Sequence, residues 1–199
     1  MLTEAELPNA VFLDTETTGL GYEDQIVEIA IIDHHGRALL ETLVRPTVPI
    51  SAEAQAVHGI TADDVATAPT FAEILPHLAA ALLDRHLVIY NRDFDLRMLA
   101  QTLAAHGLLA AEGSLHQRLD EAFAPRAYHC AMLAYAEFWG GWNYRRKSYR
   151  WQSLTTAARQ QHCRLPAGLR AHRARADAEL TRQLVLKMLE QTNEPNPDP

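Results

Sequence analysis

The segment Ala10–Gly19, AVFLDTETTG, joins a short apolar run to two closely spaced carboxylates. The apolar residues predict a buried β-strand over 10–14. Because side chains alternate along a strand, Asp14 and Glu16 point to one face of the sheet, where they repel each other unless a cation lies between them. Hard cations such as Mg²⁺ and Mn²⁺ prefer such oxygen ligands, and the small residues that follow let a ligand approach the backbone closely. The alternative is a strand end that carries two solvated acids.

The rest of the pattern predicts an α/β fold. Four further strands are expected at 25–33, 38–45, 86–90 and 127–128, of which the first two form a hairpin. Helical periodicity and capping residues predict helices over 52–57, from 61, over 70–83 with an interruption at Pro76, and over 94–106, 130–138, 153–161 and 175–191. A hairpin followed by alternating strands and helices favours three α/β/α layers around a mixed five-stranded sheet.

Length and composition fit one domain over residues 1–191, followed by a disordered proline-rich tail at 192–199. Hydrophobic residues make up 48% of the 199 positions, and no apolar run approaches the roughly 20 residues that span a membrane. The stretch 1–6 is acidic where a secretion signal is basic, so we expect a cytoplasmic protein. Cys130 and Cys163 lie in no metal-ligand spacing and are expected as reduced thiols, with a disulfide between them as the alternative.

Positive charge is concentrated in one segment. Residues 140–176 contain 9 of the 18 lysines and arginines and no acidic residue. This segment therefore carries a charge of +9, and because the net charge of the chain is −7, the other residues together carry −16. Such a segment is typical of a phosphate-binding surface, although a solvated basic face gives the same pattern. Within it, the loop 139–151 interleaves rings with cations, which can stack bases and follow the phosphates of a single strand. The side chains expected to do so are Trp142, Tyr144, Arg145, Arg146, Lys147, Tyr149 and Arg150. The alternative is a loop whose tryptophans attach it to the core.

Two further motifs carry acidic residues. Asn91 follows the strand 86–90, and Asp95 lies near the start of the next helix. Ligands bind at the strand ends of α/β sheets, so Asp95 can face the carboxylates of the first motif; the alternative is a first-turn acid favoured by the helix dipole. His172 and Asp177 are five residues apart, which places the histidine in the loop before the last helix and the aspartate one turn inside it. A surface histidine and a first-turn acid are the alternatives for this pair.

The three motifs in this order resemble those of the DEDDh exonucleases, the DnaQ-like group of the RNase H-like superfamily that contains polymerase proofreading subunits. The resemblance covers residue 10 to about residue 190. The matching positions are Asp14 and Glu16 in the first motif, Asn91 and Asp95 in the second, and His172 and Asp177 in the third. The histidine five residues before the last aspartate marks the histidine subclass, and no core position is substituted.

The resemblance implies a metal-dependent 3′-5′ exonuclease with an RNase H-like fold. The four acidic residues would hold two divalent cations, Mg²⁺ or Mn²⁺, and His172 would be the general base that acts on the attacking water. The products would be nucleoside 5′-monophosphates, released preferably from single-stranded DNA. The positions expected to contact the terminal nucleotide are Thr17, Thr18, Gly19, Leu20, His58, Asn91 and Phe94.

Two alternatives stay open, namely an exoribonuclease of the same family and a non-catalytic nucleic-acid-binding accessory of a polymerase. The implied nucleic-acid partner is a single strand or a 3′ end, and the implied protein partner is a polymerase or repair protein. No membrane is expected as a partner. An aspartyl-phosphate phosphatase would need Asp-x-Asp-x-Thr after the first strand, where this chain has Glu16. A nucleotide-binding dehydrogenase would need Gly-x-Gly-x-x-Gly there, and it is missing.

Overall fold

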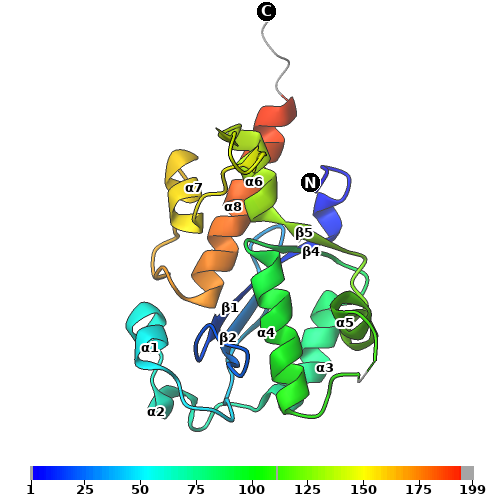
Figure 1. Ribbon diagram of the computed structural model, residues 1–199, viewed down its shortest axis with the longest axis vertical. Helices are drawn as coiled ribbons and strands as arrows, with labels where there is room; N and C mark the ends of the chain where they lie inside the picture. Colours follow the sequence, from blue (N-terminus) through cyan, green and yellow to red (C-terminus); the bar gives the residue numbers. More distant parts are fainter. Residues whose placement is uncertain (1, 111, 194–199) are drawn as a thin grey trace, which may run out of the picture.

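The computed structural model describes residues 2–110 and 112–193 (Figure 1). Five strands form one sheet in the order β3-β2-β1-β4-β5. They are β1 (Ala10–Thr17), β2 (Ile26–Asp33), β3 (Ala38–Leu43), β4 (His86–Ile89) and β5 (Ala127–Cys130). The sheet is mixed, because β1 runs antiparallel to β2 and parallel to β4, while β3 and β5 extend the antiparallel and parallel sides.

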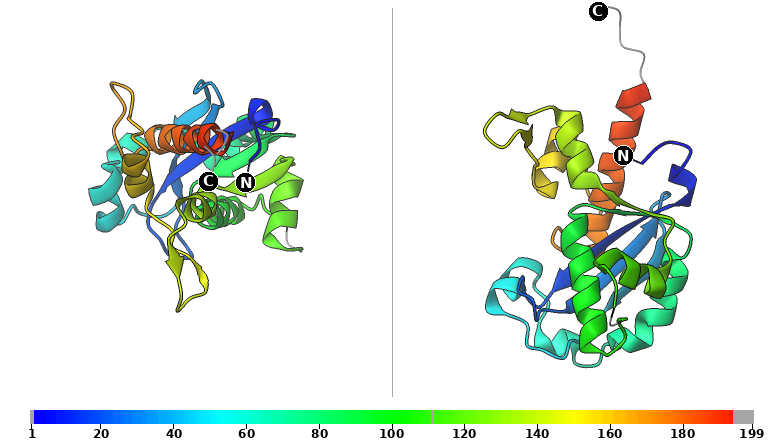
Figure 2. Two further views of the ribbon diagram at one scale, coloured as in Figure 1. Left: turned by 90° about the horizontal axis from the view of Figure 1, so that it is seen from above. Right: turned by 45° about the vertical axis from the view of Figure 1, so that its right-hand side comes forward.

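Helices cover both faces of this sheet, so the predicted three-layer arrangement is confirmed (Figure 2). One face packs against α3 (Phe71–Leu82), α4 (Arg92–Ala105) and α5 (Leu115–Phe123). The other face packs against α6 (Ala131–Trp139), α7 (Leu154–Gln160) and α8 (Ala174–Asn193). The shorter elements are η1 (Leu7–Asn9), α1 (Ala52–His58), α2 (Ala62–Val65), β6 (Trp142–Asn143) and β7 (Ser148–Tyr149).

The alternation of side chains along β1 decides where the acidic residues point. Val11 and Leu13 belong to the core beneath α3 and α4, whereas Phe12 belongs to the core beneath α6 and α8. Asp14 and Glu16 continue the series of Phe12 at a spacing of two residues. Both carboxylates therefore project from the α8 face of the sheet, near the carboxyl end of the strand.

The interruption predicted at Pro76 is wrong, because α3 runs through it as one helix. A proline in a helix interior costs about 3 kcal/mol. Thr70 and Glu73 form a capping box that fixes the start of the helix. Four of its apolar side chains are buried, namely Phe71, Ile74, Leu78 and Leu82. Each such burial contributes about 1.5–3 kcal/mol, so together they outweigh the proline.

Two other features of the middle of the chain differ from the prediction. α4 begins at Arg92 rather than at 94, which places Asp95 in its first turn and Asn91 at its N-cap position. α5 was not predicted, although Ser114 and Gln117 form a capping box at its start.

The carboxyl-terminal region also needs corrections. The predicted loop 139–151 contains the β6–β7 hairpin. α8 continues to Asn193, so a tail cannot begin at 192, and the remainder of the predicted tail, 194–199, lies outside the described residues. The single domain over 1–191 stays a prediction. None of the helices in the described part of the chain combines the length and apolar character that a membrane span requires.

Candidate active site and metal centre

Three carboxylates meet near the carboxyl end of β1. Asp14 and Glu16 come from the strand and Asp177 from the first turn of α8, and one oxygen of each lies within 4.8 Å of the other two. His172 lies in the loop before α8, as predicted, and lines the same cavity of about 170 Å³. Asp14 and Asp177, which are 163 positions apart in the chain, thus converge because α8 packs on the face of β1 that carries both acids.

Asp95 lines this cavity from the first turn of α4, together with Asn91 and Phe94. Its side chain is buried, and its Oδ1 accepts a hydrogen bond from the Thr15 hydroxyl at 2.8 Å. Among the described residues, Asp95 is not in the set of three whose oxygens lie within 4.8 Å of one another. The structure therefore brings all five core positions of the three motifs to one cavity, and Asp95 and His172 lie outside the close set of Asp14, Glu16 and Asp177.

Burial raises the pKa of all four carboxyl groups, and neighbouring negative charge adds to the rise for Asp14, Glu16 and Asp177. For Asp14 the raised pKa comes mainly from loss of water, followed by the charge of Asp95. Burial, then Asp177 and Glu28, raise the pKa of Glu16 to about 8. Burial also raises the pKa of Asp95 to about 7 and that of Asp177 above its ordinary range. Four acids of this kind ionise together only beside a compensating cation, and an all-oxygen donor set fits a hard divalent ion such as Mg²⁺ or Mn²⁺.

An ion pair between the buried Glu28 and the partly exposed Arg173 holds the loop that carries His172. Glu28 stands opposite Glu16 in the β1–β2 register and is 5% exposed. Both of its oxygens accept from the Arg173 Nε at 3.0 Å, and one of them accepts from the Ala174 backbone N–H at 2.9 Å. His172 itself has a φ of +58°, a left-handed conformation that its neighbours must impose.

The sequence analysis missed Glu28 and Arg173. The available signal was a charged residue inside β2, whose eight residues are otherwise almost all apolar and are all buried. A carboxylate in such a strand requires a partner, because an unpaired buried charge is very costly. The partner lies 145 residues away, so no local pattern identifies it.

A second cavity, of about 370 Å³, adjoins Glu16 between the end of β1 and α1. Four of the predicted contact residues line it: Thr17, Gly19, Leu20 and His58. The ring of His58 is buried, and its Nδ1 accepts from the Ile60 N–H at 2.9 Å. Its Nε2 therefore carries the proton and donates to the Thr17 carbonyl at 3.2 Å. The imidazole fixes the wall of the cavity, and no ring nitrogen is left for another partner.

Hydrogen bonds within the loop after β1, and from α4 to it, fix the conformation of this loop. Thr18, another predicted contact residue, is fully buried, and its hydroxyl donates to Asp24 at 2.6 Å. A side chain on Gly19 would place its Cβ 2.6 Å from an Asp24 carboxylate oxygen, so Asp24 would have to move and would weaken its hydrogen bond with Thr18. Arg97 of α4 donates to the carbonyls of the same loop and lies 5.2 Å from the centre of the Phe94 ring. The loop is thus held against α4 and leaves Leu20 exposed at the cavity.

The β6–β7 hairpin leaves the end of α6 and extends from the body of the molecule (Figure 2). All seven of its predicted nucleic-acid contacts are solvent-exposed, and Tyr144 is 84% exposed. The alternative of tryptophans attached to the core does not fit Trp142 or Trp151, which are 39% and 58% exposed. The segment after the hairpin reaches the acidic cavity, because the Tyr90 hydroxyl donates to the Gln152 carbonyl at 2.9 Å and the next helix begins there. Binding of nucleic acid by these side chains stays a prediction.

Comparison with known proteins identifies relatives over almost the whole chain. Residues 11–185 match the exonuclease family model RNase_T. A protein of Escherichia phage 186 named uncharacterized exonuclease CP81 is 42% identical over 175 residues, which are 88% of this chain and 85% of the relative. Exodeoxyribonuclease 10 of Escherichia coli (strain K12) is 29% identical over 180 residues, 89% of this chain and 67% of the relative. Exonuclease X, solved in complex with 5′ overhanging duplex DNA, superposes with a TM-score of 0.64 at 27% identity and covers 94% of both chains.

Proposed function

The chain belongs to the DEDDh branch of the RNase_T exonuclease family, and we propose that it releases nucleoside 5′-monophosphates stepwise from the 3′ end of single-stranded nucleic acid. The observation that supports this best is the convergence of Asp14, Glu16 and Asp177 within 4.8 Å, in a cavity that His172 also lines. The names of the E. coli exodeoxyribonuclease and of the solved DNA complex favour DNA over RNA as the substrate. A polymerase or repair partner stays a prediction.

We assign four residues to two divalent cations, Mg²⁺ or Mn²⁺: Asp14, Glu16, Asp95 and Asp177. When bound, such ions activate water and stabilise the negative charge on the leaving oxygen of an in-line displacement. The chain holds the four carboxylates in place through β1, the first turns of two helices and the Thr15–Asp95 hydrogen bond. His172 is exposed at the rim of the cavity, where its ring can accept the proton of the attacking water.

The cavity beside Glu16 is the proposed site of the terminal nucleotide. It opens next to the carboxylates and combines the backbone of Thr17 and Gly19 with the exposed side chain of Leu20. Phe94, which lines the acidic cavity, offers a ring for stacking on the other side of Glu16. The exposed rings and cations of the hairpin would then carry the rest of the strand.

The first test concerns polarity. A linear DNA strand with a blocked 3′ terminus should resist digestion in Mg²⁺, whereas the same strand with a blocked 5′ terminus should be degraded at the rate of the free strand. The cavity that adjoins one side of the acidic site can hold a terminal nucleotide, and the choice of the 3′ terminus rests on the resemblance to the DEDDh exonucleases. The measurement is the time course of mononucleotide release, resolved by chromatography.

The control substrates are a circle of the same sequence and its RNA counterpart. The circle should remain intact, and the RNA should be degraded more slowly than the DNA. Internal cleavage of the circle, or equal degradation from both ends, would contradict an exonuclease acting at 3′ ends. Faster degradation of the RNA would overturn the DNA preference and leave the polarity unaffected.

A second prediction treats Glu28 as a positioning residue. Glu28→Gln keeps the shape of the side chain but weakens its hold on Arg173, so the loop carrying His172 loses its fixed conformation. Groups that orient functional residues typically contribute about 10–100-fold to activity. We therefore expect kcat to fall by about that factor with KM nearly unchanged, since the nucleotide cavity is built from other residues.

Glu179→Gln is the matched control for this variant. Glu179 is equally buried and pairs with Arg182 at 2.7 Å, on the same helix but away from the acidic cavity. Both variants should lower Tm, because each weakens an ion pair whose carboxylate is buried. Only Glu28→Gln should lower kcat; if the two variants lose kcat in proportion to their loss of Tm, Glu28 has a structural role alone.

A further inference from the structure

A second cluster of metal-binding side chains lies far from the acidic cavity. Glu6 precedes η1, His86 is the first residue of β4, and His129 is the third residue of β5. One ligand atom of each lies within 4.8 Å of the other two. None of the three lines the cavity of the four carboxylates. The cluster is therefore a separate feature of the fold.

Strand pairing brings the two histidines together. Val88 stands directly opposite His129, and side chains two residues apart on a strand share a face, so His86 and His129 are diagonal neighbours. The Nδ1 of His86 lies 3.1 Å from the Nε2 of His129. Ala10 of β1 pairs with His86, and the short η1 helix ends just before Ala10. This connection brings Glu6 to the same place, where its Oε1 lies 3.8 Å from the His86 Nδ1.

The carboxylate of Glu6 is oriented before any ion arrives. Its Oε2 accepts from both the backbone N–H and the hydroxyl of Thr3, at 2.8 Å each. This leaves Oε1 on the side of the imidazoles, and outer contacts of this kind are what fix metal-binding side chains. His86 is only 8% exposed, so it cannot swing away into water.

We propose that Glu6, His86 and His129 form a binding site for a transition-metal ion, with Zn²⁺ as the expected occupant. Tetrahedral zinc with bonds of about 2.0–2.2 Å places neighbouring ligand atoms about 3.3 Å apart. The observed 3.1 and 3.8 Å lie on either side of that value. Imidazole nitrogens suit zinc, whereas the all-oxygen site suits Mg²⁺ or Mn²⁺, so the two sites select different ions.

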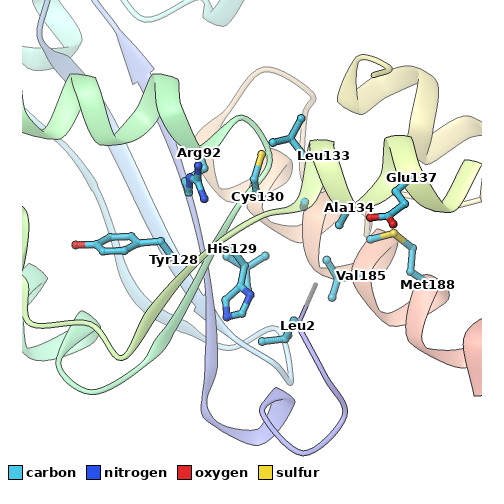
Figure 3. A pocket seen from close by; sticks show the side chains of 12 residues that line it. Leu2, Arg92, Tyr128, His129, Cys130, Leu133, Ala134, Glu137, Val185 and Met188 are labelled. Atoms are coloured by element: carbon cyan, nitrogen blue, oxygen red, sulfur yellow. The ribbon is translucent and has the colours of Figure 1, made fainter. Parts of the chain in front are cut away.

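The position of the cluster supports the assignment. Ala10 of β1 pairs with His86, and Asp14 lies four residues further along the same strand. Roughly 13 Å of strand therefore separates the histidine cluster from the carboxylate site, so the two sites cannot share an ion. His129 also lines a cavity of about 270 Å³ beside Leu2 and Val185, so the cluster adjoins this cavity at one of its three side chains (Figure 3). A bound ion would join the segment before β1 to two parallel strands at the edge of the sheet.

The test uses the full chain with Asp14→Asn, which weakens the carboxylate site. Titration with Zn²⁺ by calorimetry should show one equivalent bound, and Co²⁺ in its place should give the visible absorption of a low-coordinate site. At a zinc concentration about 100-fold above Kd, Tm should rise by roughly 5–10 °C, because the ion binds only the folded protein. Adding His129→Ala should remove the bound equivalent, the cobalt absorption and the rise in Tm together.

Two further variants make the result specific. His77→Ala removes an exposed imidazole on α3 and should leave zinc binding at the level of the Asp14→Asn parent. Glu6→Gln keeps an oxygen that can accept a hydrogen bond from Thr3, so this variant should fold normally. Its affinity for zinc should nevertheless fall at least tenfold, because an amide is a poor ligand. Unchanged zinc affinity in both His129→Ala and Glu6→Gln would overturn the proposal. So would the lack of any bound equivalent in the Asp14→Asn protein, which would leave the cluster as a histidine–histidine hydrogen bond beside an ion pair.

Discussion

Asp14→Asn is expected to lower the rate of mononucleotide release by about 10³-fold or more. The amide is a poor ligand for a hard cation, and Asp14 lies within 4.8 Å of both Glu16 and Asp177, so the loss affects an ion that all three would share. Charge stabilisation by bound cations is worth several kcal/mol, and about 4 kcal/mol corresponds to about 10³-fold in rate. The measurement is single-turnover digestion of a labelled strand in Mg²⁺, and chelation of the metal should bring the parent down to the rate of the variant.

Stability separates loss of a ligand from loss of the fold. The pKa of Asp14 is raised by burial and by Asp95, so its ionisation opposes folding once the pH exceeds the ordinary pKa of the group. The neutral amide removes that cost, and in metal-free buffer at neutral pH the Tm of Asp14→Asn should equal or exceed that of the parent. Asp93→Asn serves as the control, because Asp93 is exposed and paired with Arg92. Full turnover of Asp14→Asn, or the same loss in Asp93→Asn, would contradict the ligand assignment.

Local sequence determines where several of the predicted side chains of this site lie. The alternation of apolar and acidic residues along β1 requires Asp14 and Glu16 to share a face. The spacing of His172 and Asp177 places one before and one inside the helix, and the structure has them there. Both inferences need only strand and helix periodicity, which is encoded by neighbouring residues.

The features that were missed depend on contacts between distant residues. Glu28 and Arg173 are 145 positions apart, and the histidines of the second cluster are 43 apart on strands whose register no local pattern specifies. The helix α5 is a different case, because its capping box at Ser114 and Gln117 is a local signal that was available. At Pro76 the local signal was misleading. A proline predicts a break in the helix, but burial of the apolar side chains of α3 keeps the helix continuous.

His172→Ala is expected to keep substrate affinity and lose turnover. His172 is exposed at the rim of the acidic cavity, and its ring contributes no carboxylate oxygen to the metal site. General base catalysis typically contributes about 10²–10⁴-fold, so kcat should fall by that factor while KM changes little. The measurement is single-turnover digestion of a labelled strand in Mg²⁺ by both proteins.

The comparison with the parent isolates the imidazole, since the four carboxylates remain in His172→Ala and only the ring is removed. His162→Ala is the matched control: it is likewise an exposed histidine in the left-handed region, with φ +56° against +58°, so strain on the backbone is comparable. If His172→Ala kept the turnover of the parent, His172 would be a surface residue, and the third motif would contribute Asp177 alone.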